Sequence, residues 1–252
     1  MSKRKTGALR KEQNQQMRNY QKHFHVAETI DFKEEYKRQR KQIELLPQSV
    51  NQEKYILSLI DRDLDIVVVS GPAGTGKTYL AMLAAIKSLR NGDCDKIILT
   101  RPAVAVDDEK HGFLPGDLNS KMEPWVRPLL DVLREYYSTK ELEHMLNEQI
   151  IEITPLAFCR GRNFKKAWVI LDEAQNATPS QMKMLMTRIC DGSKIVITGD
   201  IEQTDRRTAD NGLLDLRSKL QQKPVTGIGV CEFEKKDIRR HKIIEHILRL
   251  YN

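Results

Sequence analysis

Residues 71–78 read Gly71-Pro72-Ala73-Gly74-Thr75-Gly76-Lys77-Thr78 and satisfy the phosphate-loop pattern G-x-x-x-x-G-K-[ST] at every position. An apolar, β-branched run at 66–69 precedes the motif, and a helical pattern rich in Ala, Leu and Met follows it at 79–89. A shorter glycine-rich turn would leave a chance match open, whereas this complete motif has the strand and the helix in the required order. We therefore expect a loop that surrounds phosphate groups, with a helix N-terminus directed at them.

The residues of this loop have separate expected roles in binding a nucleoside triphosphate and magnesium. The glycines let several backbone N–H groups converge on one point. Lys77 is expected to reach the β- and γ-phosphates, and the hydroxyl of Thr78 is expected to ligate Mg²⁺. The expected nucleotide contacts in the loop are Gly71, Pro72, Ala73, Gly74, Thr75, Gly76, Lys77 and Thr78. The sequence thus predicts a site for ATP and Mg²⁺.

A second strongly apolar strand, at 167–171, runs directly into Asp172 and Glu173. The carboxyl ends of parallel strands meet at one sheet edge, so both acids are expected beside the phosphate loop. There Asp172 would hold the Mg²⁺ shell and Glu173 would polarise the attacking water. The structural alternative is an acidic helix N-terminus, where carboxylates interact well with the helix dipole. A strand at 194–198 brings Gln203 to the same edge, where it is expected to sense the γ-phosphate.

Strand and helix patterns alternate along the chain. Strands are expected at 66–69, 96–100, 150–153, 167–171, 194–198 and 225–233. Helices are expected at 51–60, 79–89, 121–137, 140–147, 178–189, 212–220 and 241–251. This alternation predicts an α/β fold, namely the doubly wound, mostly parallel sheet of a RecA-like P-loop NTPase with helices on both faces.

Composition bounds the class of protein. The chain has 252 residues, which suggests one P-loop domain at 45–252 and an N-terminal arm at 1–44. Its longest apolar runs fall far short of the roughly 18 residues that a membrane span needs. The four cysteines lie 31 or more residues apart, which fits neither a metal site nor a disulfide framework. With no secretory signal in the N-terminal residues, these features predict a cytoplasmic protein.

The N-terminal arm carries the excess positive charge. Residues 1–42 contain twelve Lys or Arg against five Asp or Glu, whereas residues 43–252 contain 30 residues of each sign. A basic, polar arm of this kind can neutralise phosphates and hold nucleic acid without reading its sequence. The alternative is a solvated terminus with no partner.

Several further motifs accompany the phosphate loop. They are Leu99-Thr100-Arg101-Pro102-Ala103, Gly112-Phe113-Leu114-Pro115-Gly116-Asp117, Arg160-Gly161-Arg162, Ile170-Leu171-Asp172-Glu173-Ala174-Gln175-Asn176, Gly199-Asp200 with Gln203, and Arg240-His241. Together they resemble the PhoH-like family, phosphate-starvation-inducible ATPases that look like a single motor domain of superfamily 1 helicases. The resemblance covers about residues 45–250. It implies that Gln52 reads adenine, that Arg101 and the glycine-proline loop border a nucleic-acid path, and that Gln203 couples the γ-phosphate to that path.

The function expected from these features is Mg-ATP hydrolysis that acts on single-stranded nucleic acid, RNA in preference to DNA. An ATP-switched nucleic-acid-binding or assembly protein without unwinding activity is the first alternative. A phosphate-loop kinase for a small substrate is the second, although the motifs around Asp172 and Gly199 suit water activation better than a substrate pocket. Stimulation of ATP hydrolysis by single strands separates the first two, and release of inorganic phosphate excludes the third.

A homo-oligomer is also expected, as a hexameric ring in the form that the resemblance implies. Hydrolysis of this type gains when an arginine stabilises charge on the γ-phosphate. With one motor domain, that arginine must come from a neighbouring subunit or be absent. The candidates are Arg160, Arg162, Arg207 and Arg240, and an ordinary surface salt bridge is the alternative for each. Arg162 and Arg240 come first because they fall in family motifs. With Lys77, Glu173 and Gln203 they complete the expected catalytic set.

Overall fold

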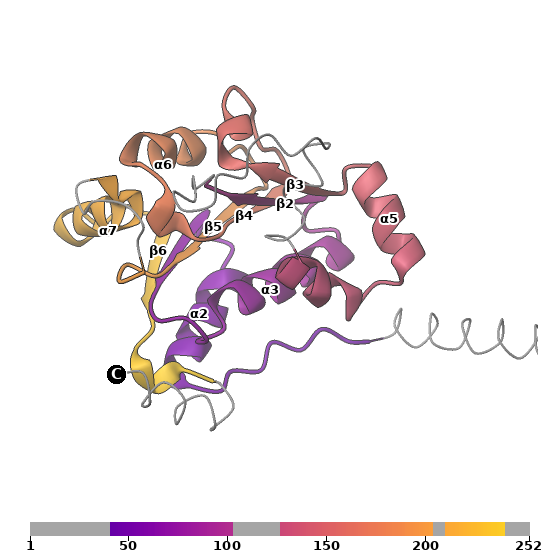
Figure 1. The fold of residues 1–252 in the computed structure, drawn as a ribbon, viewed down its shortest axis with the longest axis horizontal. Coiled ribbons are helices and arrows are strands. Elements are labelled where there is room, and N and C mark those ends of the chain that lie inside the picture. Colours follow the sequence, from indigo (N-terminus) through magenta and orange to yellow (C-terminus); the bar gives the residue numbers. More distant parts are fainter. Residues whose placement is uncertain (1–40, 103–126, 204–209, 240–252) are drawn as a thin grey trace, which may run out of the picture.

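The computed structural model describes residues 41–102, 127–203 and 210–239 (Figure 1). Its helices are α2 Val50–Ile60, α3 Lys77–Asn91, α5 Thr139–Asn147, α6 Pro179–Met186 and α7 Gly212–Gln222. Its strands are β1 Ile66–Ser70, β2 Lys96–Arg101, β3 Ile151–Pro155, β4 Ala167–Leu171, β5 Lys194–Gly199 and β6 Ile228–Glu232. Short 3-10 turns are η1 Leu156–Cys159, η2 Ala174–Asn176 and η4 Lys235–Asp237. Most of the arm, the glycine-proline loop, Arg207, Arg240 and the helix expected at 241–251 lie outside the described residues.

The strands form one sheet in the order β3-β2-β4-β5-β1-β6, and every pairing between them is parallel. The predicted doubly wound sheet is therefore confirmed. Because β5 lies between β1 and β4, the phosphate loop after β1 and the acids after β4 leave the sheet at neighbouring points of one edge. Ligands bind at this carboxyl edge in open parallel sheets.

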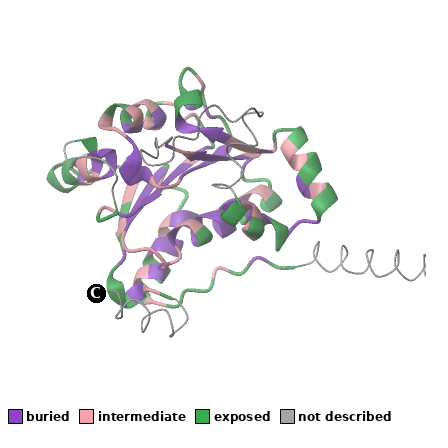
Figure 2. Cartoon of the chain, viewed as in Figure 1, coloured by how far each residue is buried: buried purple, intermediate pink, exposed green. Residues whose placement is uncertain are grey.

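Both faces of the central part of the sheet are covered, so the inner strands β1, β4 and β5 are buried and mostly apolar (Figure 2). Val67 and Val69 of β1 point into a core formed with α2, α3 and α5, with the helical residues 127–134 on the same side. Ile66 and Val68 point into a second core formed with α6 and α7. The expectation of helices on both faces is confirmed. None of the helices in the described ranges combines the length and the apolar character needed to cross a bilayer.

Several expected boundaries were wrong. The helix expected to end at residue 137 ends at residue 134, because the N–H of Glu135 donates to the carbonyl of Val132 in a tighter turn. The helix expected to continue to residue 189 ends at Met186, because Ile189 instead forms a bridge with Phe164. The last strand begins at Ile228 and not at Val225, because the backbone turns at Gly227, whose φ is 85°. The expected cap of α6 is present: the hydroxyl of Thr178 accepts from the backbone N–H of Gln181.

Candidate active site

The phosphate loop joins β1 to α3 in the conformation that its glycines allow. Gly71 has a φ of 147° and donates its N–H to the carbonyl of Gly199 at 3.2 Å. A Cβ atom at Gly71 would lie 2.5 Å from the carbonyl oxygen of Phe233, so a side chain there has no room. Gly76, with a φ of 82°, is the N-cap of α3. The positive end of the α3 dipole thus faces the space enclosed by the loop.

The side chain of Lys77 folds back onto the phosphate loop. Its Nζ donates to the carbonyl oxygens of Gly71 at 2.6 Å and Pro72 at 2.8 Å. The residue is 8% exposed. The ammonium group is therefore held against the backbone of the phosphate loop, next to the space that the loop encloses.

Gln52 supports the loop from behind. Its Nε2 donates to the carbonyl oxygen of Thr75 at 3.0 Å, and its Oε1 accepts from the backbone N–H of Gln48 at 2.7 Å. The residue lies in the first turn of α2, which Ser49 caps. Both ends of the Gln52 amide are thus engaged within the chain, and the reading of adenine stays a prediction.

The turn after β6 also braces the loop. The backbone N–H of Arg239 donates to the carbonyl of Gly74 at 2.9 Å. Asp237 joins this turn to α2, because its carboxylate accepts from Asn51 Nδ2 at 2.7 Å. Burial by itself raises the pKa of Asp237, but hydrogen bonds from the backbone of Glu234 and from Asn51 and Ser49 outweigh burial and lower it. Segments far apart in sequence therefore fix the phosphate loop.

Asp172 and Thr78 lie together, as expected for a magnesium site. The hydroxyl of Thr78 donates to Asp172 Oδ1 at 2.8 Å. Thr198, fully buried on β5, donates to the same oxygen at 2.7 Å. No sequence pattern indicated Thr198, because its position beside Asp172 depends on the pairing of β4 with β5. A hydroxyl and a carboxylate are the hard oxygen ligands that suit Mg²⁺.

The described residues contain no cluster of three or more His, Cys, Asp or Glu that could hold a metal ion alone. Magnesium commonly binds one or two protein groups and completes its shell with substrate phosphates and water. The pair formed by Thr78 and Asp172, next to the phosphate cradle, fits that mode of binding.

Glu173 is held by two donors. Its Oε1 accepts from Arg101 Nη2 at 2.6 Å, and its Oε2 accepts from Gln175 Nε2 at 2.6 Å. Gln175 is positioned in turn by the backbone N–H of Asp200, which donates to its Oε1 at 3.0 Å. Arg101 Nη2 is also 3.7 Å from Asp172 Oδ2. The guanidinium of Arg101 therefore lies at the acidic pair itself, a placement that only the strand order reveals.

These elements enclose a cleft of about 270 Å³. Its lining residues are Ala73, Gly74, Gly76, Lys77, Thr78, Tyr79, Asp172, Glu173, Gly199, Asp200 and Gln203. The structure thus brings together the expected phosphate-binding lysine, the expected magnesium pair, Glu173 and Gln203. Tyr79, which follows the motif on α3, lines the cleft as well and had no distinguishing signal in the sequence.

Of the expected arginines, the structure describes Arg160 and Arg162, and neither lines this cleft. Arg162 makes a two-pronged ion pair with Glu152 of β3, in which Nη2 lies 2.7 Å from Oε2. Its hydrogen bond to Glu152 raises the pKa of Arg162. Arg160 is exposed.

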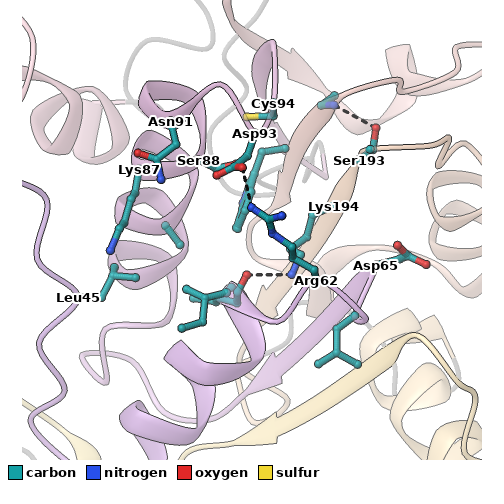
Figure 3. A pocket seen from close by; sticks show the side chains of 17 residues that line it. Leu45, Arg62, Asp65, Lys87, Ser88, Asn91, Asp93, Cys94, Ser193 and Lys194 are labelled. Carbon is teal, nitrogen blue, oxygen red and sulfur yellow. Dashed lines mark hydrogen bonds and ion pairs between the residues drawn. The ribbon is translucent and has the colours of Figure 1, made fainter.

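A larger hollow of about 530 Å³ lies at the opposite edge of the sheet, between the C-terminal ends of α2 and α3 (Figure 3). Charges of both signs line it, with an ion pair of 3.1 Å between Arg62 and Asp93. Lys194 Nζ donates to the carbonyl of Leu59 at 2.9 Å, and burial lowers the pKa of Lys194. This hollow contains none of the phosphate-loop or acidic motif residues, so we do not assign the nucleotide to it.

A groove of about 570 Å³ lies between η1 and α6, which follow the carboxyl ends of β3 and β4. Its lining residues are Ala157, Arg160, Ser180, Gln181, Lys183, Met184, Thr187 and Arg188. The formally charged side chains among its described lining residues, Arg160, Lys183 and Arg188, are all cationic. Phe158, in the same turn as Arg160, is 55% exposed.

Comparison with known proteins agrees with this geometry. The family model described as PhoH-like protein matches residues 44–252. A PhoH-like protein of Bacillus subtilis (strain 168) is 43% identical over 222 residues, which are 88% of this chain and 68% of that protein. Protein PhoH of Escherichia coli (strain K12) is 37% identical over 190 residues, which are 74% of this chain and 53% of that protein. The chain spans about half to two thirds of the length of these relatives.

Among solved structures, the large terminase from a thermophilic bacteriophage aligns with a TM-score of 0.48 and 13% identity, covering 82% of this chain and 51% of that chain. The family assignment comes from the sequence matches, and the range of the family model, 44–252, includes the phosphate loop, both acids and Gln203. On the extent of these matches, the chain belongs to the PhoH-like family.

Proposed function

We propose that this protein is a magnesium-dependent ATPase of the helicase-like kind that acts on single-stranded nucleic acid, with RNA preferred over DNA. The observation that carries the ATPase part is the convergence of Lys77, Thr78, Asp172 and Glu173 on one cleft. A phosphate cradle, a metal-binding pair and a carboxylate for water are the parts that phosphoryl transfer to water requires.

Each residue has a defined task in this proposal. Lys77 exchanges the loop carbonyls for the β- and γ-phosphates, and Glu173 orients the attacking water. Asp172 and Thr78 hold Mg²⁺, which when bound neutralises charge on the phosphates. Gln203, exposed at the cleft, senses the γ-phosphate.

The groove between η1 and α6 supports the nucleic-acid part. Arg160, Lys183 and Arg188 provide cations for a phosphodiester backbone, and the described part of the lining contains no carboxylate. An exposed aromatic ring beside such a groove suits base stacking, and Phe158 supplies one. The basic arm at 1–44 adds affinity that is indifferent to sequence. The preference for RNA rests on the family resemblance.

We place the protein in the cytoplasm and expect it to work as a hexameric ring. In the ring, an arginine of one subunit completes the site of the next. Arg162 is occupied by Glu152 within its own chain, so Arg240, of the two motif arginines, is the first to test. Mixing Lys77→Ala chains with Arg240→Ala chains restores some complete sites if the arginine acts between subunits. A monomer with full activity at nanomolar concentration would exclude a shared site.

The decisive experiment is a steady-state assay of inorganic phosphate release from Mg-ATP, with and without poly(U) and poly(dT). We expect stimulation by both polymers and a larger effect of poly(U). Phosphate release that neither polymer changes would refute action on single strands. It would favour the alternative of an ATP-switched binding or assembly protein. A specific observation supports that alternative, because both oxygens of Glu173 already accept hydrogen bonds from side chains.

A further inference from the structure

We propose that Arg101 controls the hydrolytic step by holding Glu173 in a non-productive position until a phosphate group of the bound single strand takes over its guanidinium. The inference rests on the proposed function and concerns the regulation of the same site. It gives Arg101 a positioning role: it acts through Glu173.

The described conformation fixes both oxygens of Glu173. One accepts from Arg101 and the other from Gln175, each at 2.6 Å. A carboxylate that orients the attacking water must direct a lone pair at that water, and here the two donors set its direction. Glu173 also has a φ of 53°, in the left-handed region that a residue with a side chain seldom adopts. The surrounding contacts therefore hold this residue in place.

Arg101 lies between the acidic pair and the cationic groove. It ends β2, which pairs with β4 on one side and β3 on the other. On the β4 side, the backbone N–H of Asp172 donates to the carbonyl of Thr100 at 3.0 Å, so the acids follow directly beside Arg101. On the β3 side, Arg101 is in register with Pro155, the residue before η1. A strand bound along the η1 groove thus passes next to the residue that holds Glu173.

The exchange has a chemical basis, because guanidinium binds carboxylate and phosphate with the same fork geometry. The side chain of Arg101 is 26% exposed, so a ligand at the sheet edge has access to it. A phosphodiester that captures the guanidinium leaves Glu173 with Gln175 alone. The γ-phosphate of ATP offers the same chemistry, and the experiment separates these two sources.

The test measures phosphate release at saturating Mg-ATP, with and without poly(U), for the full chain and for Arg101→Ala. Loss of a hydrogen bond between charged groups corresponds to about ten- to a hundredfold in an equilibrium, so Arg101→Ala should raise the strand-free rate by about tenfold or more. Poly(U) should then add little. Arg217→Ala is the matched control, since Arg217 pairs with Glu232 outside the cleft and its side chain is 23% exposed.

Two further variants tie the gain to Glu173. Arg101→Ala combined with Glu173→Gln should lose the gain, because the freed side chain is no longer a carboxylate. Arg101→Lys, which keeps the charge but not the fork, should fall between the parent and Arg101→Ala. Thermal unfolding of each variant checks that the fold persists.

Other outcomes overturn the inference. A strand-free rate of Arg101→Ala equal to that of the parent, with stimulation by poly(U) retained, would show that Arg101 does not restrain Glu173. A rate that falls with and without poly(U), in a folded variant, would place the guanidinium on the γ-phosphate of ATP. Failure of the proposed function gives a different result, in which no polymer stimulates the parent. The strand-free rate of Arg101→Ala would then still show whether Arg101 restrains Glu173.

Discussion

Thr198→Val should weaken the magnesium dependence of the protein without weakening metal-free nucleotide binding. Thr198 and Thr78 donate to the same oxygen of Asp172, at 2.7 and 2.8 Å. Valine has nearly the shape of threonine, so the substitution removes one of the two hydroxyl donors and leaves the packing of β5 largely intact. Asp172 would then be less firmly oriented toward the metal.

The size of the effect follows from the kind of bond that is lost. A hydrogen bond to a charged group contributes about 1.5–3 kcal/mol, and loss of a partner that orients a metal ligand commonly costs about 10–100-fold in metal affinity or activity. We therefore expect the Mg²⁺ concentration for half-maximal phosphate release to rise by about tenfold or more. A fluorescent ATP analogue titrated in EDTA should bind the variant and the parent equally.

Two controls make this result specific. Thr154→Val alters another buried threonine of the same sheet, on β3, whose side chain has no hydrogen bond to Asp172 among the described residues, and should leave the Mg²⁺ curve unchanged. Thr198→Ser keeps the hydroxyl and should restore most of the parent behaviour. An unaltered Mg²⁺ curve for folded Thr198→Val would refute the assignment of Asp172 as a ligand that Thr198 orients.

Three other expectations follow from the site and its supports. Lys77→Ala should abolish tight ATP binding, whereas Glu173→Gln should keep binding and lose phosphate release; hydrolysis by Glu173→Gln at the parent rate would assign the water to another acid, such as Asp200. Deleting residues 1–42 should flatten the salt dependence of poly(U) affinity, and equal slopes for both chains would leave the arm without this role. Because the folded pKa of Asp237 is lowered, its contribution to stability is present above the ordinary aspartate value of 3.8 and is lost as pH falls through the folded value. The melting temperatures of the parent and Asp237→Asn should therefore differ at pH 7 and converge in acid, and a constant difference down to pH 2 would contradict that linkage.

The sequence was most informative where a local pattern determines a local structure. Parallel strands buried on both faces read as apolar runs, which is why β1 and β4 were predicted close to their true ends. The phosphate loop specifies its own backbone through its glycines, so spacing alone could place Lys77 and Thr78 at the end of the loop, where they line the cleft.

Side-chain contacts between strands could not be predicted in this way. Thr198 reaches Asp172, and Arg101 reaches Glu173, only because β5 and β2 flank β4, and strand order is not a property of any single segment. Gln52 shows the same limit. The family resemblance assigned it to adenine. Its contact with the Thr75 carbonyl could not be predicted, because that contact depends on how α2 packs against the loop.

The turn after β6, which holds the phosphate loop in place, is synthesised long after the loop itself. During synthesis, the whole phosphate-loop motif leaves the ribosome more than 150 residues before Arg239, which donates to the carbonyl of Gly74. Phe233 likewise donates its N–H to Ser70 at the start of the loop, at 2.8 Å. A nascent chain that stops before β6 therefore carries every residue of the motif but lacks these two backbone contacts, although Gly199 and Gln52 are already present. Affinity for ATP should therefore rise along a series of lengthening chains once they include Arg239, which makes nucleotide binding a measure of whether the chain extends past β6.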